Sequence, residues 1–123
     1  MEDFDLRSQI LDSKDISEVE MVIPEWNNAK IVVRELNGAD RADVMNQSLK
    51  KDGLPDLTKL YPLMVIKSVR YPADHKKHGE RVFSVADRDS LGQKSGAILE
   101  RIGGEAMRIS GMGKKERDEI QGN

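Results

Sequence analysis

The first regular pattern along the chain covers residues 19–23, where every second side chain is apolar and the run stops at Pro24. A period of two is typical of a strand that buries one face. A short β-branched run follows at residues 30–34, and the segment between the two runs is rich in turn-forming residues. The pattern therefore predicts an antiparallel hairpin, in which acidic side chains of the first strand can face basic side chains of the second if the register allows.

Two segments in the middle of the chain have the composition and spacing of helices. Residues 39–51 are rich in polar side chains and follow the N-capping residue Asn37, so they predict a surface helix. Residues 57–71 carry apolar side chains at helical spacing over a broad stripe and predict the most buried helix. Pro62 lies within that stripe and removes a backbone donor, so this helix either starts near Tyr61 or kinks there.

The segment after the buried helix is polar and contains the turn-forming residues Pro72 and Gly79. Residues 72–80 predict an exposed loop that closes a second, shorter β pair, which ends at residues 82–83. Ser84 and Asp87 have the spacing of a capping box and predict the start of a short helix. Gly92 is expected to end that helix.

The last helix is predicted over residues 95–109, because their apolar side chains share one face at three- and four-residue steps. The pair Gly103–Gly104 inside it costs about 1 kcal/mol per glycine relative to alanine, and is either a close-packing site or a weak point. Residues 112–123 have Met112 and Ile120 as their only sizeable apolar side chains, so we expect a flexible tail there.

Together these elements predict an α+β fold with small antiparallel β-hairpins packed on about four helices. Residues 1–111 are expected to form a single folded domain, since a chain of 123 residues has the usual size of one hydrophobic core. The expected core consists of side chains that the strand and helix patterns place on one face. They are Met21, Ile23, Ile31, Val33, Leu60, Met64, Ile98, Leu99 and Ile102.

Charge is nearly balanced over the whole chain but not along it. Twenty Lys and Arg against 22 Asp and Glu give a net charge of −2, which argues against a general nucleic-acid-binding protein. Residues 1–25 are acidic and residues 67–81 are basic, which we interpret as solvated surface. The acidic N-terminus lacks the pattern of an export signal, and no apolar stretch approaches the roughly 20 residues of a membrane span. We therefore expect a soluble, intracellular protein with no membrane partner.

No pattern in the chain predicts catalysis or metal binding. Cysteine is absent, which excludes disulfides, thiolate nucleophiles and Cys-based zinc sites. His75 and His78 lie beside Lys76 and Lys77, whose charges would repel a cation, and only acidic neighbours in the same loop could serve as a third ligand. Phosphate-binding loops and nucleophile motifs do not occur. We expect no catalytic, metal or cofactor site, and the basic loop offers at most a contact with nucleic acid or an acidic partner.

Several short motifs follow one another in a characteristic order. They are Ile23-Pro24-Glu25-Trp26, the run from Val32 to Arg41, Arg81-Val82-Phe83-Ser84, Leu91-Gly92 with Lys94-Ser95, and Ile109-Ser110-Gly111. In order and spacing they resemble motifs of the tail assembly chaperones of bacteriophages and prophages with long, flexible tails. The resemblance covers about residues 6–112 and rests on the shared order, since each motif is short.

The resemblance implies a protein that is not an enzyme and holds no metal or cofactor. It implies binding to the tape measure protein, a very long helical chain whose apolar stripes must stay soluble until tube subunits polymerise around it. The tail tube protein and a second copy of the chain are further candidate partners. The protein would act in the host cytoplasm and be absent from, or minor in, the finished tail.

Three residues are candidates for the contact with the partner. They are Trp26, Met107 and Met112, because tryptophan is a frequent hot spot and methionine adapts to different contact surfaces. Trp26 follows Pro24 in a turn, so its alternative role is a lid that folds back on the core.

Two other functions are compatible with the sequence. A virion structural protein, for head–tail joining or tail completion, would have the same small fold but would be found in purified particles. A small nucleic-acid-binding regulator would rest on the segment from His75 to Arg81 alone. The resemblance also implies a longer second product made by ribosomal slippage, for which the codons of Gly113, Lys114 and Lys115 are the candidate site.

Overall fold

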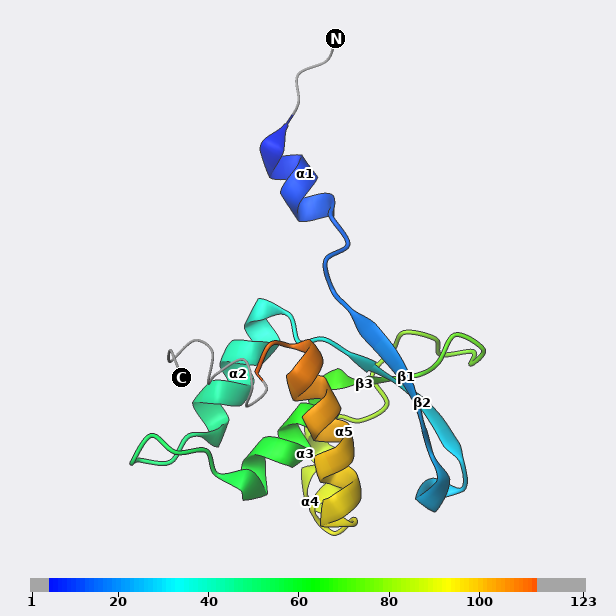
Figure 1. Cartoon of the computed structure of the whole chain (residues 1–123), viewed down its shortest axis with the longest axis vertical. Helices are drawn as coiled ribbons and strands as arrows, with labels where there is room; N and C mark the ends of the chain where they lie inside the picture. Colours follow the sequence, from blue (N-terminus) through cyan, green and yellow to red (C-terminus); the bar gives the residue numbers. More distant parts are fainter. Residues whose placement is uncertain (1–4, 113–123) are drawn as a thin grey trace.

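The computed structural model describes residues 5–112 and consists of a three-stranded antiparallel sheet with helices packed beside it (Figure 1). The elements, with short 3-10 helices written η, are α1 (Leu6–Asp12), β1 (Glu18–Ile23), η1 (Pro24–Trp26), β2 (Ala29–Arg34), α2 (Gly38–Ser48), α3 (Leu57–Ser68), β3 (Val69–Arg70), η2 (Val85–Asp87), α4 (Arg88–Gly92) and α5 (Gly96–Ile109). The α+β fold class is confirmed.

The predicted hairpin is present as β1 and β2, which pair antiparallel over their full length. Glu18 lies opposite Arg34, and the Arg34 Nε donates to the Glu18 Oε2 at 2.6 Å. The turn ends at Asn27 and Asn28, whose φ angles of 54° and 58° lie in the left-handed region. Asparagine tolerates this region better than most residues, which explains the turn chemistry between the strands.

The second β pair differs from the prediction. The chain passes from α3 directly into β3, which joins β2 as the third strand of the same sheet. Residues 82–83 form no strand, and a single isolated bridge joins Arg70 to Arg81. The free edge of β2 is already extended and accepts β3, whereas residues 82–83 lead at once into η2. The tip of the connecting loop, residues 73–78, is exposed as predicted.

The central helix α3 begins at Leu57, four residues before Tyr61, and continues through Pro62. Its first turn is capped by Asp56, whose carboxylate accepts a hydrogen bond from the Thr58 N–H at 3.0 Å. Pro62 removes the hydrogen bond to the carbonyl of Thr58, which lies in the exposed first turn. The missing bond leaves only a carbonyl in this exposed turn without its helical partner, so the helix can include Pro62 and begin before Tyr61. It has more buried residues than any other described helix, as predicted.

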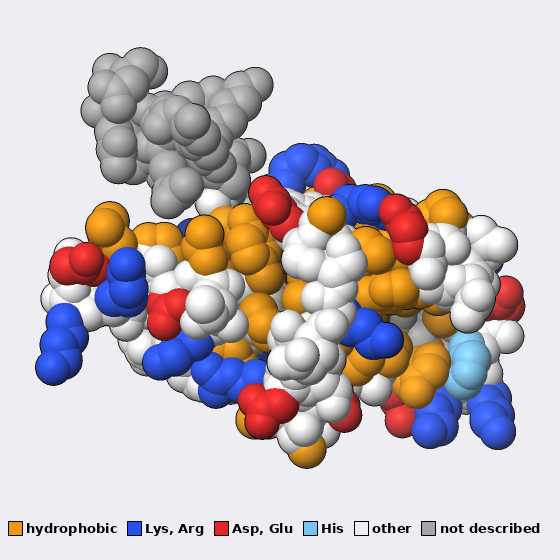
Figure 2. Space-filling model, turned by 90° about the horizontal axis from the view of Figure 1, so that it is seen from below, with side chains coloured by type: hydrophobic (Ala, Val, Ile, Leu, Met, Phe, Trp, Pro, Cys, Tyr) orange, Lys and Arg blue, Asp and Glu red, His pale blue; other side chains and the backbone are white. Residues whose placement is uncertain are grey.

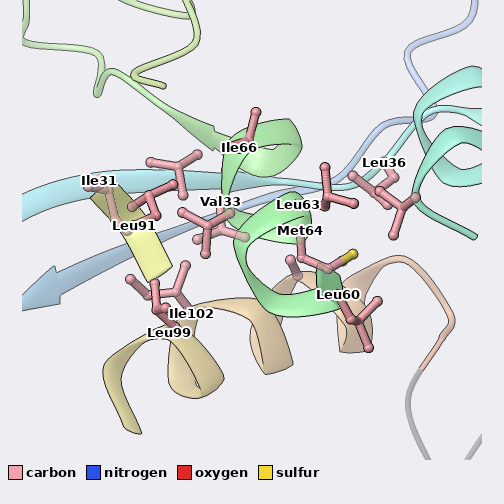
Figure 3. Packing of buried hydrophobic residues seen from close by; sticks show 14 of the residues in the cluster. Ile31, Val33, Leu36, Leu60, Leu63, Met64, Ile66, Leu91, Leu99 and Ile102 are labelled. Atoms are coloured by element: carbon pink, nitrogen blue, oxygen red, sulfur yellow. The ribbon is translucent and has the colours of Figure 1, made fainter. Parts of the chain in front are cut away.

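The core lies between the sheet and the helices α3 and α5 (Figure 3). Helix α3 contacts α2, α4, α5 and β2, so it is the centre of the packing. In Figure 3, Ile31 and Val33 of β2 point towards Leu99 and Ile102 of α5. Of the nine predicted core residues, all are buried except Met21, which is partly buried against the others.

The two glycines in α5 have different surroundings. A Cβ on Gly103 would lie 2.7 Å from the Cδ1 of Tyr61, whereas a Cβ on Gly104 would meet nothing within 4 Å. Gly103 is therefore a close-packing site between α5 and α3. Gly104 has no such role among the described residues.

The chain ends lie partly outside the description. Residues 1–4 and 113–123 are not described, and they include most of the predicted tail and the proposed slippage site at Gly113, Lys114 and Lys115. Met112 is described and is only 7% exposed, with its N–H donating to the Met107 carbonyl at 2.8 Å. Within residues 5–112, no helix has both the length and the apolar character needed to cross a membrane.

Candidate partner-binding groove

The structure separates the three predicted contact residues into two places. Met107 and Met112 lie together where α5 ends, and both line one groove. Trp26 lies elsewhere, in a hollow shared with Phe83 and Leu91. Trp26 is half-buried and packs against the core, so part of its ring also remains in contact with solvent.

We call the first of these places the α2–α5 groove. It has a volume of about 230 Å³ and lies between α2, the segment that connects α2 to α3, and the end of α5. Its lining is predominantly apolar. The lining residues are Arg41, Met45, Ser48, Leu49, Gly53, Pro55, Leu60, Met107, Gly111 and Met112.

One wall of the groove is a tight loop after α2. An isolated bridge pairs Leu49 with Pro55, and the Lys50 N–H donates to the Leu54 carbonyl at 2.8 Å. Gly53 makes the turn at φ 85°, a conformation that favours glycine. These bonds hold the loop as a small hairpin and place the Leu49 and Leu54 side chains in solvent.

The opposite wall is held by hydrogen bonds between the end of α5 and the start of α2. The Leu36 N–H donates to the Ser110 hydroxyl at 3.0 Å, and the Arg41 guanidinium donates to the Ser110 carbonyl at 2.8 Å. Gly111 then reverses the chain at φ 70° and brings Met112 back beside Met107. The two methionines are thus fixed in the groove by the backbone that follows α5.

Exposed apolar side chains gather around this groove. Met45, Leu49, Leu54 and Leu57 are 40–58% exposed, and they account for four of the ten large exposed hydrophobic residues that the described chain presents. The left side of Figure 2, where Figure 1 has α2, shows hydrophobic side chains at the surface. Clustered apolar surface of this kind marks interaction sites in soluble proteins.

Three of these exposed residues, Met45, Leu49 and Leu54, lie in segments that the sequence pattern assigns to a polar surface helix and to its end, so the pattern does not single them out. Leu57 belongs to the apolar stripe that predicts the most buried helix, and the structure leaves it 56% exposed. The available signal is the repetition of apolar side chains at positions 45, 49 and 54 within a polar stretch. Their neighbours Met107 and Met112 lie about 50 residues away in sequence, and only the tertiary fold brings them together.

Charged side chains contribute little to the groove lining. Arg41 is the one charged residue among the lining residues, and its guanidinium is hydrogen-bonded to the Ser110 carbonyl. Lys50, Lys51 and Lys59 are exposed in the neighbouring segment, which also carries Asp52 and Asp56. The nearby acids have partners, since hydrogen bonds lower the pKa of Asp43, mainly from Lys67, and that of Asp56, mainly from Thr58. The groove is therefore defined by its apolar lining rather than by charge.

The hollow at Trp26 is held by an ion pair across the molecule. Arg101 of α5 donates two hydrogen bonds to the Glu25 carboxylate, at 3.0 and 2.7 Å. These bonds, with the positive charge of Arg101, lower the pKa of Glu25 to about 2. The pair joins the hairpin turn to α5, and the contact role of Trp26 stays a prediction.

The basic loop is ordered by its own histidine. The His75 ring stacks on Tyr71 with centroids 4.4 Å apart, and its Nδ1 accepts a hydrogen bond from the Lys77 N–H at 2.9 Å. The Lys77 ammonium lies 5.7 Å from the centre of the Tyr71 ring. Among residues 5–112, no group of three or more His, Asp or Glu side chains is placed to hold a metal ion.

Solved structures, unlike protein-family models and curated proteins, include a match to this chain. No protein-family model matches the chain. No curated protein matches it either. Among solved structures, it is similar to the tail assembly chaperone of bacteriophage HK97, with a TM-score of 0.57 and 23% sequence identity over 84% of this chain and 91% of that one. The chain therefore has the fold of a solved phage tail assembly chaperone, in agreement with the family that its motifs resemble.

Proposed function

We propose that this protein is a phage tail assembly chaperone that binds the tape measure protein and keeps it soluble in the host cytoplasm during tail morphogenesis. The observation that carries the proposal is the shared fold, which extends over 84% of the chain. The order of the sequence motifs supports the same family independently. The role is one of binding, and the proposal includes no catalytic step.

The α2–α5 groove is the surface that fits this role best. A long helical partner presents apolar side chains at three- and four-residue steps, and a shallow apolar groove accepts one such face. Met45, Met107 and Met112 line the groove, and flexible thioether side chains adapt to helices of different sequence.

The test is co-expression of the chain with a helical fragment of the tape measure protein from the same phage, followed by measurement of the soluble fraction of the fragment. We expect the chain to raise this fraction severalfold and to be purified with the fragment. The variant Leu49→Lys is expected to lose both effects, because it places a charge in the apolar wall. Val85→Lys is the matched control, since Val85 is 61% exposed and lies outside the groove.

Two results would contradict the proposal. If the fragment is equally insoluble with and without the chain, the chaperone function is wrong. If mass spectrometry finds the chain in purified phage particles at a fixed ratio to the tube subunit, the chain has a structural role in the virion instead of the proposed chaperone function. Equal activity of Leu49→Lys and Val85→Lys would show that the partner binds at another surface.

A further inference from the structure

The hollow around Trp26 is a second candidate site, at the end of the molecule where α5 begins. It has a volume of about 300 Å³ and is formed by the hairpin turn, the segment before η2, α4 and the residues that follow α4. Its lining residues are Glu25, Trp26, Asn27, Phe83, Leu91 and Lys94. We call this place the Trp26 hollow.

Three of the short sequence motifs meet at this hollow. The motifs at residues 23–26, 81–84 and 91–95 supply all of its lining residues except Asn27. The other two motifs each supply one residue of the α2–α5 groove, Arg41 and Gly111. Segments that are far apart in the sequence thus form one surface, which the proposed contact with the tape measure protein does not use.

The walls of the Trp26 hollow are held by bonds within the chain. Both oxygens of the Glu25 carboxylate accept hydrogen bonds from Arg101, which holds the hairpin turn beside α5. The segment of Phe83 is fixed by the capping box that follows it, in which the Ser84 N–H donates to the Asp87 carboxylate at 2.8 Å. Because the walls are fixed before a ligand arrives, binding costs little conformational entropy.

The unused polar groups of the hollow are mainly hydrogen-bond donors. Within residues 5–112, the Trp26 indole N–H has no acceptor and the Lys94 ammonium forms no ion pair. The carboxylate of Glu25 is already bound by Arg101, and Asn27 adds an amide that can donate or accept. Tryptophan and lysine side chains only donate, so the hollow favours a ligand with acceptor oxygens.

The remaining lining of the hollow is apolar. Trp26 and Phe83 are half-buried aromatic side chains, and Leu91 is only 4% exposed. Aromatic side chains around a hollow bind an apolar anchor of a partner well. A carboxylate beside such an anchor accepts charge-assisted hydrogen bonds from a lysine, and these bonds are stronger than those between neutral groups.

We propose that the Trp26 hollow binds a short segment of a second partner protein, in which an aromatic or aliphatic side chain stands next to an aspartate or glutamate. The apolar side chain enters between Trp26, Phe83 and Leu91, and the carboxylate binds to Lys94 and the indole N–H. The hollow and the α2–α5 groove lie at opposite ends of α5, about 20 Å apart along a helix of 14 residues (Figure 1). Both sites can therefore be occupied at once, and this proposal does not rest on the chaperone function.

The experiment follows the indole N–H signal of the full-length chain by magnetic resonance. Trp26 is the only tryptophan, so this signal reports the hollow alone. The probe is the blocked peptide acetyl-Glu-Leu-Phe-Glu-amide, and its matched control is acetyl-Gln-Leu-Phe-Gln-amide. We expect the acidic peptide to shift the signal saturably and to bind about threefold more tightly than the control, which is the size of effect that an exposed ion pair has.

Two lysine variants test whether Lys94 binds the carboxylate. Lys94→Gln is expected to bind both peptides equally, because the cation of the hollow is removed. Lys50→Gln, at an exposed lysine outside the hollow, is expected to keep the preference of the wild type. Both lysines are exposed, so both variants are expected to melt like the wild type.

Three results of these titrations would overturn the proposal. They are an indole signal that does not respond to the acidic peptide, equal binding of the two peptides by the wild type, and a preference that survives Lys94→Gln.

Two further titrations test other occupants of the hollow. A signal that shifts with a helical fragment of the tape measure protein would assign the hollow to that partner. A signal that shifts with the concentration of the chain itself would assign it to a second copy, and either result would overturn the proposal of a second partner protein. Solubility of the fragment is not measured here, so failure of this proposal leaves the chaperone function and its own test unaffected.

Discussion

Gly103 shows how one missing side chain can set the distance between two helices. The Cβ of an alanine there would lie 2.7 Å from the Tyr61 ring, a distance at which the ring or the helix must move. Alanine also favours the helical conformation by about 1 kcal/mol, which opposes the loss. The clash concerns a ring atom close to the backbone of a packed helix, so we expect the loss of stability from the clash to exceed the gain from the helix propensity of alanine.

The first prediction concerns the two adjacent glycines. Gly103→Ala is expected to lower the free energy of unfolding by about 1–3 kcal/mol through overpacking. Gly104→Ala is the matched control and is expected to raise it by about 0.4–1 kcal/mol, because it has the same helical benefit and meets nothing within 4 Å. Denaturant titration of both variants checks the pair, and equal changes would contradict the close-packing role of Gly103.

The ion pair between Glu25 and Arg101 makes the stability of the folded protein depend on pH. The pKa of Glu25 is lowered from 4.5 to about 2 by the hydrogen bonds from Arg101. A carboxylate with a lowered pKa in the folded state stabilises the protein at pH values above its unfolded pKa. The contribution is then lost as the pH falls from about 4.5 to about 2.

The second prediction follows from this sign. Glu25→Gln is expected to lower the melting temperature at neutral pH, and the difference from the wild type is expected to shrink between about pH 4.5 and about pH 2. Glu100→Gln, at an exposed position in α5 beside Arg101, serves as the control and should show no such trend. Thermal melting across this range is the measurement, and a difference that does not vary with pH would contradict the ion pair.

At the scale of the element, α5 is the clearest case of a helix defined by its apolar face. Ile102 is fully buried in the middle of that face and packs in the core beside the sheet. The third prediction is that Ile102→Ala lowers the free energy of unfolding by about 2–5 kcal/mol, from lost burial and the cavity left behind. Glu100→Ala, two residues away and exposed, is expected to change it by less than about 0.5 kcal/mol. If denaturant titration shows that Ile102→Ala lowers the free energy of unfolding by less than about 1 kcal/mol, the buried position of Ile102 is wrong.

The elements that the sequence predicted well are those with strong local signals. The hairpin follows from alternation and turn residues, α2 from the N-cap Asn37, and the short helix after Ser84 from its capping box, which is present in the structure. The differences arose where tertiary contacts decide. The strand β3 exists because β2 offers a free edge, and the start of α3 depends on its Asp56 cap rather than on Pro62.

The candidate site was predicted less completely than the fold. Met107 and Met112 were identified as contact residues, and the structure places both in the groove, although their binding role is untested. The groove itself needs the loop after α2 and the chain reversal at Gly111 to come together, and no local pattern specifies that meeting. Trp26 shares no surface with the two methionines, which a linear sequence cannot show.

For the whole molecule, the described residues divide into a packed body and the projecting helix α1 (Figure 1). The body has one core and a prominent apolar groove, and α1 has exposed apolar side chains and no buried residue. This division explains how a chain of 123 residues can be well folded and still present a substantial apolar surface for binding.

The methionines give this surface a spectroscopic property. Three of the six, Met45, Met107 and Met112, line the groove, whereas Met64 is fully buried in the core. In a sample isotope-labelled at the methionine methyl groups, magnetic resonance therefore observes occupancy of the groove at three sites and has Met64 as an internal reference. An occupant that enters the groove shifts the first three signals and leaves the fourth in place. The chain thus reports occupancy of the groove through its own methyl groups, without an attached probe.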